Sequence, residues 1–325
     1  TTSSGSSSGF GSSSSSSSGS YFPEQPVLGK DSLPIAFANA ENFEQESLES
    51  IKLGIRKAKA EEKARKKAEE EAKLAEAKFE EAQVAEAAPD AVVHLAAISF
   101  VGHSQASAFY DVNVIGTLNL LDALKELKHP PTKVLLASSA NVYGNCEESP
   151  IAESQTPAPT NHYAMSKLAM EYLAKNYQAQ LPLFFVRPFN YTGAGQSPSF
   201  VVPKIVAHFK EKATTIELGN LHVEREYNDV RMVCDIYLRL LTSAETGETY
   251  NICTGQTYTL QQIIATLTEL SGHTIQVKVN PAFVRAHEVH RLCGNPTKLI
   301  NTIGSLPSFA FRDTLNAMLM AAPTS

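Results

Sequence analysis

Short apolar segments alternate with helical segments through the middle of the chain, and this alternation most narrows the folds open to it. PDAVVHLAA at 89–97 and KVLLASS at 133–139 are typical of strands, and 111–128 between them has helical spacing. The order repeats with a predicted helix at 163–178 and a strand at 181–189. Strands that alternate with helices indicate a parallel sheet covered on both faces. We therefore predict an α/β fold with a Rossmann-like, doubly wound parallel sheet.

The distal part of the chain has a different texture. Shorter elements such as VVPKIVAHF, ETYNICTG and LQQIIATLTELSG are separated there by loops rich in Gly, Pro and Asn. We predict a Rossmann domain over residues 1–189 and a smaller mixed α/β domain over residues 190–325. Some strands and helices of the second domain are expected to return to the first.

The first 88 residues are atypical of such a domain. Residues 1–20 contain thirteen Ser and four Gly, which cannot form a buried core. Residues 41–88 hold 13 Glu and 10 Lys or Arg, a pattern that predicts a solvated helix or a broken pair of helices. Between them, only Pro26–Lys30 resembles a strand. The apolar core is therefore expected beyond residue 88.

Charge and cysteine usage exclude several classes of protein. The formal net charge is -6, so no basic excess favours a nucleic-acid partner. No stretch approaches 18 uninterrupted apolar residues and no signal peptide is visible, so we expect a cytoplasmic protein without a membrane partner. Four cysteines, Cys146, Cys234, Cys253 and Cys293, form no CxxC pair. We expect small buried side chains rather than a zinc site or disulfides.

Three side chains are candidates for catalysis. ASSANVYG places Ser139 at the carboxyl edge of a strand, where open α/β sheets bind ligands. Tyr163 and Lys167 are four residues apart on a predicted helix and share a face. A tyrosine with a pKa of about 10 needs a neighbouring cation to serve as an acid or base at pH 7. Alternatively, Tyr163 is a half-buried helix residue and Lys167 a surface charge.

An ordered series of motifs makes the catalytic interpretation specific. PDAVVHLAA, DVNVIGTLNLLDA, SSANVYG, YAMSKLAMEYL, VRPFNYTGAGQ, GNLHVEREYNDVR and VRAHEVHRLCGNPTKL follow one another between Pro89 and about Leu315. This series resembles the extended short-chain dehydrogenase/reductase family that acts on nucleotide sugars. The resemblance implies an oxidoreductase with NADP or NAD as cofactor, bound by the Rossmann domain, and a sugar-nucleotide site in the second domain.

The resemblance also implies roles for individual residues. Tyr163 would donate or accept the proton, Lys167 would hold the nicotinamide ribose and lower the tyrosine pKa, and Ser139 would orient the substrate oxygen. Asn190 would contact the sugar nucleotide. The other cofactor contacts implied are Leu95, Ala96, Ala97, Asn113, Ala137, Ser138, Pro188 and Phe189.

The distal motifs resemble reductases that convert GDP-4-keto-6-deoxymannose to GDP-rhamnose. Guanidinium groups pair bidentately with phosphate, and a carboxylate accepts from vicinal hydroxyls. For each arginine the alternative is a surface salt bridge. The resemblance implies that Val202 and Lys204 approach the base, that Arg225 and Arg285 clamp the pyrophosphate, and that Glu288 accepts from the nucleoside ribose.

The sequence disfavours one other activity of the family and leaves two alternatives open. Dehydratases carry an acidic residue just after the catalytic serine, where this chain has Ala140 and Asn141, so dehydration is disfavoured. A 4-epimerase with tightly bound NAD is one alternative, and a catalytically silent sugar-nucleotide-binding protein is another. The motifs leave open the nucleotide base, the C4 configuration of the product, and NADH against NADPH.

The expected dinucleotide loop is the point at which the chain departs from the family. Members carry GxxGxxG after the first strand, whereas this chain offers GSSSGFG, from Gly5 through Gly9 to Gly11. Either residues 1–88 stand in for the unidentified cofactor half, or the chain is a fusion without its dinucleotide loop. We favour the first, because a sheet that began near residue 89 would expose a hydrophobic edge.

Two further expectations concern histidines and subunits. His287 and His290 lack the one-turn spacing of HExxH, so no metal site is predicted, and His94 is interpreted as a structural histidine. The helices at Asn113–Lys128 and Tyr163–Gln178 resemble those that pair subunits in the family. We therefore expect a homodimer.

Overall fold

The computed structural model describes most of the chain beyond residue 81. The described ranges are 82–100, 105–283 and 290–322, together with residues 59, 62, 63, 66 and 67. The chain divides into two compact units, Thr1–Glu69 and Glu70–Ser325. In the first unit the described positions are helical, and Lys66 pairs with Glu62 at 2.8 Å, as the charge pattern predicts. The strand-like segment Pro26–Lys30 lies outside the described residues.

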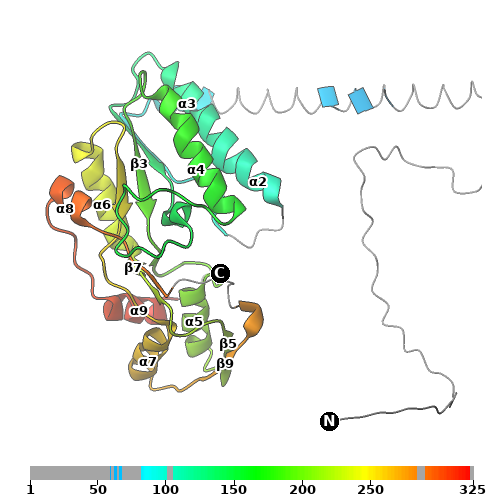
Figure 1. Ribbon diagram of the computed structural model, residues 1–325, viewed down its shortest axis with the longest axis vertical. Helices are drawn as coiled ribbons and strands as arrows, with labels where there is room; N and C mark the ends of the chain where they lie inside the picture. Colours follow the sequence, from blue (N-terminus) through cyan, green and yellow to red (C-terminus); the bar gives the residue numbers. More distant parts are fainter. Residues whose placement is uncertain are drawn as a thin grey trace, which may run out of the picture. The chain divides into compact units, whose positions relative to one another are not determined.

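A four-stranded parallel sheet forms the centre of the second unit (Figure 1). Its order is β1 (Ala91–His94), β2 (Lys133–Ala137), β3 (Leu183–Pro188) and β8 (Thr249–Ile252). The first three are the predicted strands, and β8 comes from the distal part of the chain. The prediction of a Rossmann-like parallel sheet is confirmed.

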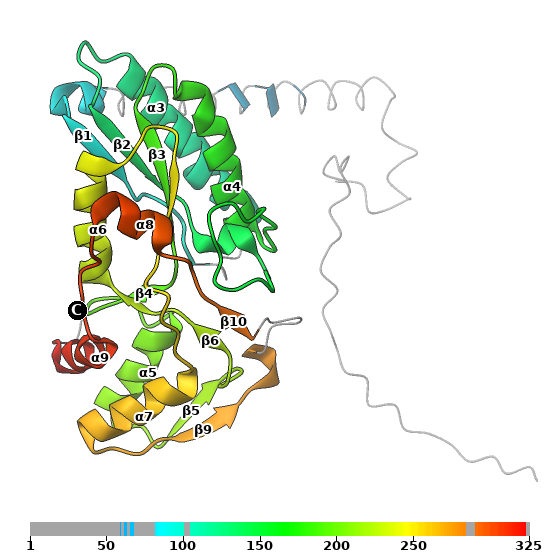
Figure 2. The same cartoon turned by 60° about the vertical axis from the view of Figure 1, so that its left-hand side comes forward.

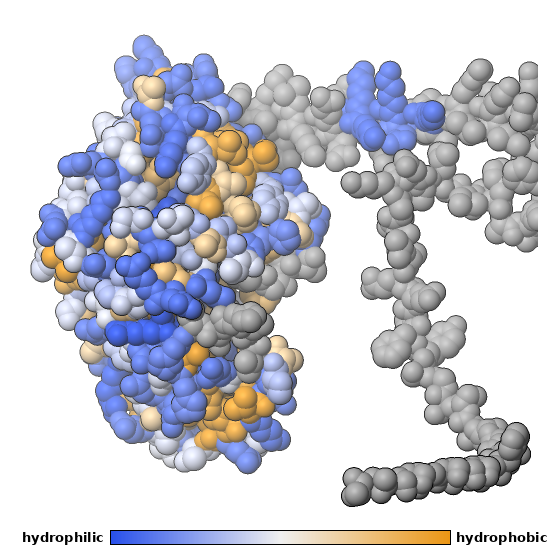
Figure 3. Space-filling view, viewed as in Figure 1, coloured by the Kyte–Doolittle hydropathy of each residue, from blue (hydrophilic) through white to orange (hydrophobic). Residues whose placement is uncertain are grey.

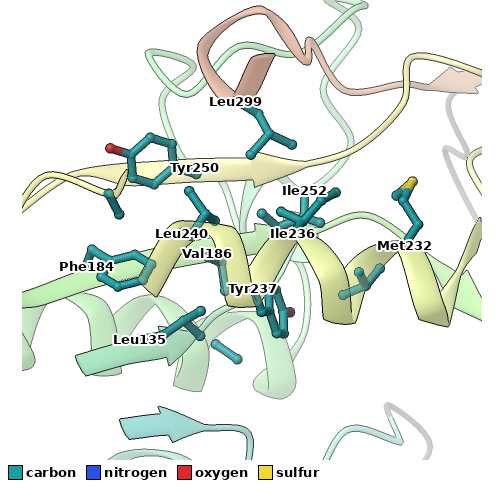
Figure 4. Close-up of a cluster of buried hydrophobic side chains, with 13 residues drawn as sticks. Leu135, Phe184, Val186, Met232, Ile236, Tyr237, Leu240, Tyr250, Ile252 and Leu299 are labelled. Carbon is teal, nitrogen blue, oxygen red and sulfur yellow. The ribbon is translucent and has the colours of Figure 1, made fainter. Parts of the chain in front are cut away.

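Residues of β2 alternate between two hydrophobic cores. Leu135 and Ala137 pack with helices α6 (Val230–Ser243) and α8 (Thr297–Ile303) on one face, as Figure 4 shows for Leu135. Val134 and Leu136 pack with α3 (Thr117–Lys125) and α4 (His162–Ala174) on the other. Because both faces are covered, residues 134–137 are all apolar rather than alternating with polar residues.

The helix between β1 and β2 begins earlier than predicted and is not uniform. It runs through α2 (Ala106–Tyr110), a π-helical turn (Asp111–Gly116) and α3. Turns of π-helix are rare and are often found at functional sites. Here the turn carries Asn113, which is fully buried.

The outer edge of β1 is open in the described part of the chain. Its one strand partner there is β2. Val93 is 39% exposed and the following Leu95 is 56% exposed. This is the hydrophobic edge predicted for a sheet that begins near residue 89.

The remaining elements form a smaller lobe (Figure 2). Its hydrophobic core is built from helices α5, α7 and α9 and the parallel pair β5 and β9. The other paired strands of the described residues form two short parallel pairs, β4 with β7 and β6 with β10. The domain boundary at 189/190 remains a prediction. Three elements beyond it, α6, β8 and α8, join or pack on the Rossmann sheet. The bounds are α5 (Val201–Lys210), α7 (Leu260–Ser271), α9 (Phe311–Met320), β5 (Thr215–Leu218), β9 (Gln276–Val279), β4 (Tyr191–Thr192), β7 (Asn228–Asp229), β6 (Glu224–Arg225) and β10 (Arg291–Leu292).

One of the four cysteines is not where the sequence predicts it. Cys146, Cys253 and Cys293 are buried, but Cys234 is exposed. Cys234 follows the buried Val233 on α6 and lies off the face that packs on the sheet. The prediction of burial is therefore wrong for Cys234.

Two properties of the described residues bear on function. No helix among them is long and apolar enough to cross a membrane. Within the same residues, no group of three or more His, Cys, Asp or Glu side chains is arranged to hold a metal ion.

Candidate active site

Ser139 lies just beyond the carboxyl end of β2 and caps a 3₁₀ turn formed by Ala140–Tyr143. Its side chain is almost fully buried. The Ser139 Oγ accepts hydrogen bonds from the backbone N and the side-chain Nδ2 of Asn141, both at 3.2 Å. Because Oγ already accepts from Asn141, its own proton is available to a neighbouring oxygen.

Tyr163 and Lys167 lie on the buried face of α4. Asn161 caps this helix, its Oδ1 accepting from the Ala164 backbone N at 2.9 Å, so Tyr163 stands in the first turn. Tyr163 is 9% exposed and Lys167 is 3% exposed. Lys167 Nζ donates to the Ala137 carbonyl oxygen at 2.7 Å, two residues before Ser139. Lys167 is thus not a surface charge.

The pKa values of this group differ from the simple expectation. Burial raises the pKa of the Tyr163 phenol, and a hydrogen bond from Ser139 opposes this rise. The lowering of the Tyr163 pKa by Lys167, which the resemblance implies, remains a prediction. Burial lowers the pKa of Lys167 to about 8, against the attraction of Glu171. At pH 7 the phenol is therefore protonated and Lys167 is charged, which suits a proton donor.

His94 is a structural side chain, as predicted. Its Nε2 lies 2.9 Å from Thr117 Oγ1, and Thr117 Oγ1 donates to the Asn113 carbonyl. Nε2 must therefore be the donor to Thr117. Burial, followed by the charge of Lys167, lowers the pKa of His94 to about 4, so it is neutral at pH 7.

The predicted cofactor residues of the sheet edge fit a bound ligand. Ser138 Oγ is buried and has no hydrogen-bond partner among the described residues. Such an atom is costly unless a ligand completes it. Leu95 and Ala96 are exposed at the end of β1 and Ala97 is half-buried. A nicotinamide cofactor would therefore find one buried polar partner and an apolar wall there.

Asn113 organises this edge from within. Its Oδ1 accepts from Ile98 N at 2.9 Å, and its Nδ2 donates to Ile98 O at 3.2 Å and to Ser166 Oγ at 3.0 Å. The amide is thus occupied by the segment after β1 and by α4. A direct cofactor contact by Asn113 remains a prediction.

Pro188 and Phe189 stand at the end of β3. Pro188 is half-buried, and Phe189 is 5% exposed with its ring centroid 6.5 Å from that of Tyr143. A Cβ on Gly294 would come within 2.6 Å of the Phe189 ring, so the Gly294 backbone packs closely against that ring. Phe184, Phe185 and Phe189 are all buried.

The predicted substrate residues are placed less uniformly. Asn190 is exposed directly after Phe189. Val202 is 2% exposed in the core of the smaller lobe. Lys204 Nζ donates to the Glu217 carbonyl at 2.9 Å and lies 4.8 Å from the Phe283 ring centroid. Arg225 is 9% exposed, and its Nη1 donates to the Glu224 carbonyl at 2.8 Å.

Five predicted residues lie outside the described part of the chain. They are Gly5, Gly9 and Gly11 of the cofactor loop and Arg285 and Glu288 of the pyrophosphate and ribose contacts. The structure therefore brings together Ser139, Tyr163 and Lys167, while the phosphate contacts remain predictions.

Sequence reasoning missed a buried ionic group behind the site. Glu171 lies one turn after Lys167 and pairs with Arg187, which also bonds Tyr143. The spacing of Tyr163, Lys167 and Glu171 at four-residue intervals was the available signal. No spacing in the sequence indicated Arg187 as the partner of Glu171, because Arg187 lies on strand β3 and not on helix α4.

Comparisons with known proteins agree with this geometry. The family model described as GDP-mannose 4,6 dehydratase matches residues 19–318, beginning well before the motif series that starts at Pro89. A GDP-6-deoxy-D-talose 4-dehydrogenase of Aggregatibacter actinomycetemcomitans is 44% identical over 217 residues, 67% of this chain and 74% of that protein. A GDP-6-deoxy-D-mannose reductase of Pseudomonas aeruginosa is 36% identical over 242 residues, 71% of this chain and 79% of that protein.

Solved structures give the same result. A Burkholderia cenocepacia J2315 protein provisionally described as an epimerase is 47% identical, with a TM-score of 0.71 over 75% of this chain and 78% of that one. The structure of RMD from Pseudomonas aeruginosa in complex with NADPH is 34% identical, with a TM-score of 0.66 over 71% of this chain and 80% of that one. The chain therefore belongs to the extended short-chain dehydrogenase/reductase family of nucleotide-sugar enzymes. Within it, the chain is an NAD(P)-dependent oxidoreductase of the GDP-6-deoxyhexose 4-reductase and 4-dehydrogenase group.

Proposed function

We propose that this protein reduces the C4 ketone of GDP-4-keto-6-deoxymannose to give GDP-rhamnose, with NADPH or NADH as reductant. The observation that carries the proposal is the buried Tyr163 phenol, which is hydrogen-bonded to Ser139 and has a raised pKa. Reduction of a ketone needs a proton for the developing alkoxide, and a phenol that stays protonated at pH 7 can supply it. The 36% identity to a GDP-6-deoxy-D-mannose reductase supports the substrate.

The chain's own residues have distinct tasks in this reaction. Ser139 Oγ and the Tyr163 hydroxyl converge on the C4 carbonyl oxygen, and Tyr163 transfers its proton as C4 becomes an alcohol carbon. The charge of Lys167 stabilises the phenolate that remains. The nicotinamide cofactor, when bound, supplies the hydride that C4 receives.

Several residues would hold that cofactor. Ser138 Oγ, a buried hydroxyl just after β2 that has no partner among the described residues, would take a polar group of the cofactor. Leu95 and Ala96 would cover its apolar surface from β1, and Pro188 would pack beside the nicotinamide. Lys167 would contact the ribose next to Tyr163.

Dehydration is not proposed, although the matching family model is named for it. Elimination of water across C5 and C6 needs its own acid and base. Ala140 cannot titrate, and the Asn141 amide donates to Ser139 Oγ. Asn141 therefore supports the serine rather than removing a proton.

A second candidate differs in the face of the ketone that is reduced. The 44% identical relative is a GDP-6-deoxy-D-talose 4-dehydrogenase. Talose and mannose differ in configuration at C4, so the same 4-keto sugar gives either product. The two candidates share every residue role given above.

The decisive assay supplies GDP-4-keto-6-deoxymannose with NADPH or NADH and follows absorbance at 340 nm. Consumption of the reductant supports the proposal, and NMR of the product separates GDP-rhamnose from GDP-6-deoxytalose. No consumption, together with interconversion of the C4 epimers of a nucleotide sugar and copurification of NAD, would identify an epimerase instead. Binding of the nucleotide sugar without NADPH binding or turnover would leave a silent binding protein.

A homodimer through the helices around Asn113–Lys128 and Tyr163–Gln178 is part of the proposal. Figure 3 shows hydrophobic surface over α2, α3 and α4. The exposed apolar side chains on these helices and the intervening π turn are Val112, Ile115, Met165, Tyr172 and Leu173. Exposed apolar patches of this kind mark protein interfaces.

A further inference from the structure

A third ionisable side chain continues the catalytic face of α4. Tyr163, Lys167 and Glu171 are spaced by one helical turn each, and all three are buried, with Glu171 only 2% exposed. The mechanism above uses the first two. Glu171 is therefore a buried carboxylate directly behind the proposed proton donor and its cation.

Arg187 of β3 pairs with Glu171 through two hydrogen bonds. Its Nε donates to Oε1 at 2.9 Å and its Nη2 donates to Oε2 at 2.6 Å, the bidentate geometry in which such pairs are strongest. Its Nη1 donates to the Tyr143 hydroxyl at 3.0 Å, and its guanidinium lies 4.9 Å from the Tyr143 ring centroid. Tyr143 in turn donates to Asn251 Oδ1 of β8 at 2.7 Å.

This network joins the two segments that carry the proposed catalytic groups. Ser139 caps the 3₁₀ turn of which Tyr143 is the last residue, and Glu171 shares α4 with Tyr163. Arg187 bonds both Tyr143 and Glu171. The distance between the Ser139 turn and the Tyr163 helix therefore depends on Arg187.

The pair also sets the charge around Lys167. Among the described groups that act on Lys167, Glu171 is the one that favours its protonated form. His94 acts on Lys167 from β1 and is neutral at pH 7. Tyr163, one turn earlier on α4, is a protonated phenol. The positive charge of Arg187 is compensated by Glu171. Without the carboxylate, burial alone would act on Lys167 and drive it toward the neutral form.

A buried ion pair is a poor means of stabilising a fold. Replacing such a pair by apolar side chains of similar volume is often neutral or stabilising. We propose that Glu171 and Arg187 are positioning residues: Glu171 keeps Lys167 protonated, and Arg187 holds the Ser139 turn against the Tyr163 helix. This inference rests on the proposed function of Tyr163 and Lys167.

The test removes the pair without leaving an unpaired charge. In Glu171→Gln/Arg187→Met, we expect kcat at pH 6 to fall by about tenfold or more, because the reacting groups are less well placed. We also expect the alkaline limb of the kcat profile to move about one pH unit toward acid, because Lys167 loses its proton more easily. If the double variant does not fold, Glu171→Gln alone should give the same direction of shift.

Two further variants separate charge from structure. Tyr143→Phe keeps the ion pair but removes the hydroxyl that ties it to Asn251, so kcat should fall while the alkaline limb stays in place. The control Glu269→Gln/Arg312→Met removes an exposed ion pair with an N–O distance of 2.6 Å, in which each side chain is more than half exposed. It should change neither kcat at pH 6 nor the position of the alkaline limb. An unshifted alkaline limb in the double variant, or an equal shift in Tyr143→Phe, overturns the role of Glu171. If kcat at pH 6 is unchanged in both Glu171→Gln/Arg187→Met and Tyr143→Phe, the positioning role of Arg187 is overturned.

A readout without substrate distinguishes failure of this inference from failure of the proposed function. The effect of Lys167→Met on the free energy of unfolding depends on the protonation of Lys167 and not on turnover. In the pair-deleted background, the pH above which this effect starts to decline should fall by about one unit from its native value near 8, because that pH is set by the pKa of Lys167 in the folded chain. The pH at which the effect vanishes is set by the unfolded chain and should not move. If the native protein has no reductase activity but this shift occurs, the proposed function fails while the charge relation stands. If the shift is absent, the charge relation is wrong whatever the activity.

Discussion

Replacing Lys167 by Met should make the fold more stable while removing activity. The Lys167 ammonium group is buried, and its pKa is about 8 in the folded chain against 10.5 for an unperturbed lysine. At about 1.36 kcal/mol per pH unit, this difference means that the charged side chain costs the fold ~3 kcal/mol at pH 7. Methionine fills a similar volume without a charge. It also gives up the hydrogen bond to the Ala137 carbonyl, worth about 1 kcal/mol, so the net gain should be ~2 kcal/mol.

The dependence on pH is the stronger part of this prediction. Between pH 8 and 10.5 the unfolded chain holds the lysine proton more firmly than the folded chain does. The cost of Lys167 is therefore present in full below pH 8 and disappears as the pH rises toward 10.5. Urea unfolding at pH 7 and pH 10 should show the stabilising effect of Lys167→Met falling by ~2 to 3 kcal/mol.

A matched control and an activity assay complete this experiment. Lys278→Met, at an exposed position of β9, should change the unfolding free energy by less than about 0.5 kcal/mol at both pH values. At pH 7, kcat of Lys167→Met should fall by at least about a hundredfold. If Lys167→Met destabilises the fold equally at pH 7 and pH 10, the burial of a charged Lys167 is refuted.

Three further predictions follow from the site and the surface. Tyr163→Phe should lower kcat by about 100- to 10,000-fold with little change in the Kd for NADPH, and retained turnover would remove Tyr163 from the mechanism. Gly144→Ala should destabilise the chain by about 3 kcal/mol or more in urea unfolding, because Gly144 has φ +65° and a Cβ would lie 1.9 Å from the Ala158 carbonyl oxygen; a change below about 1 kcal/mol would contradict this. Sedimentation should give a dimer, and Ile115→Glu with Tyr172→Glu should give monomers; a native monomer would contradict the predicted interface.

Much of the fold and part of the site could be predicted from local patterns. The apolar runs of β1, β2 and β3 could be recognised in short segments, because the strands of a parallel sheet are mostly apolar. The spacing of Tyr163 and Lys167 placed both on one helix face, and the strand before Ser139 placed it at the sheet edge. These features depend on residues close in sequence, so periodicity was sufficient.

The tertiary structure decided the environment of those residues. Glu171 and Arg187 come from a helix and a strand, and only the packing of α4 on β3 brings their charges within 2.6 Å. The same packing buries Tyr163 and Lys167, and this burial raises the pKa of Tyr163 and lowers that of Lys167. It also brings β8, from beyond residue 190, into the central sheet. The sequence alone determined which groups could do the chemistry, whereas burial and long-range contacts determined their charge, because both depend on neighbours that are distant along the chain.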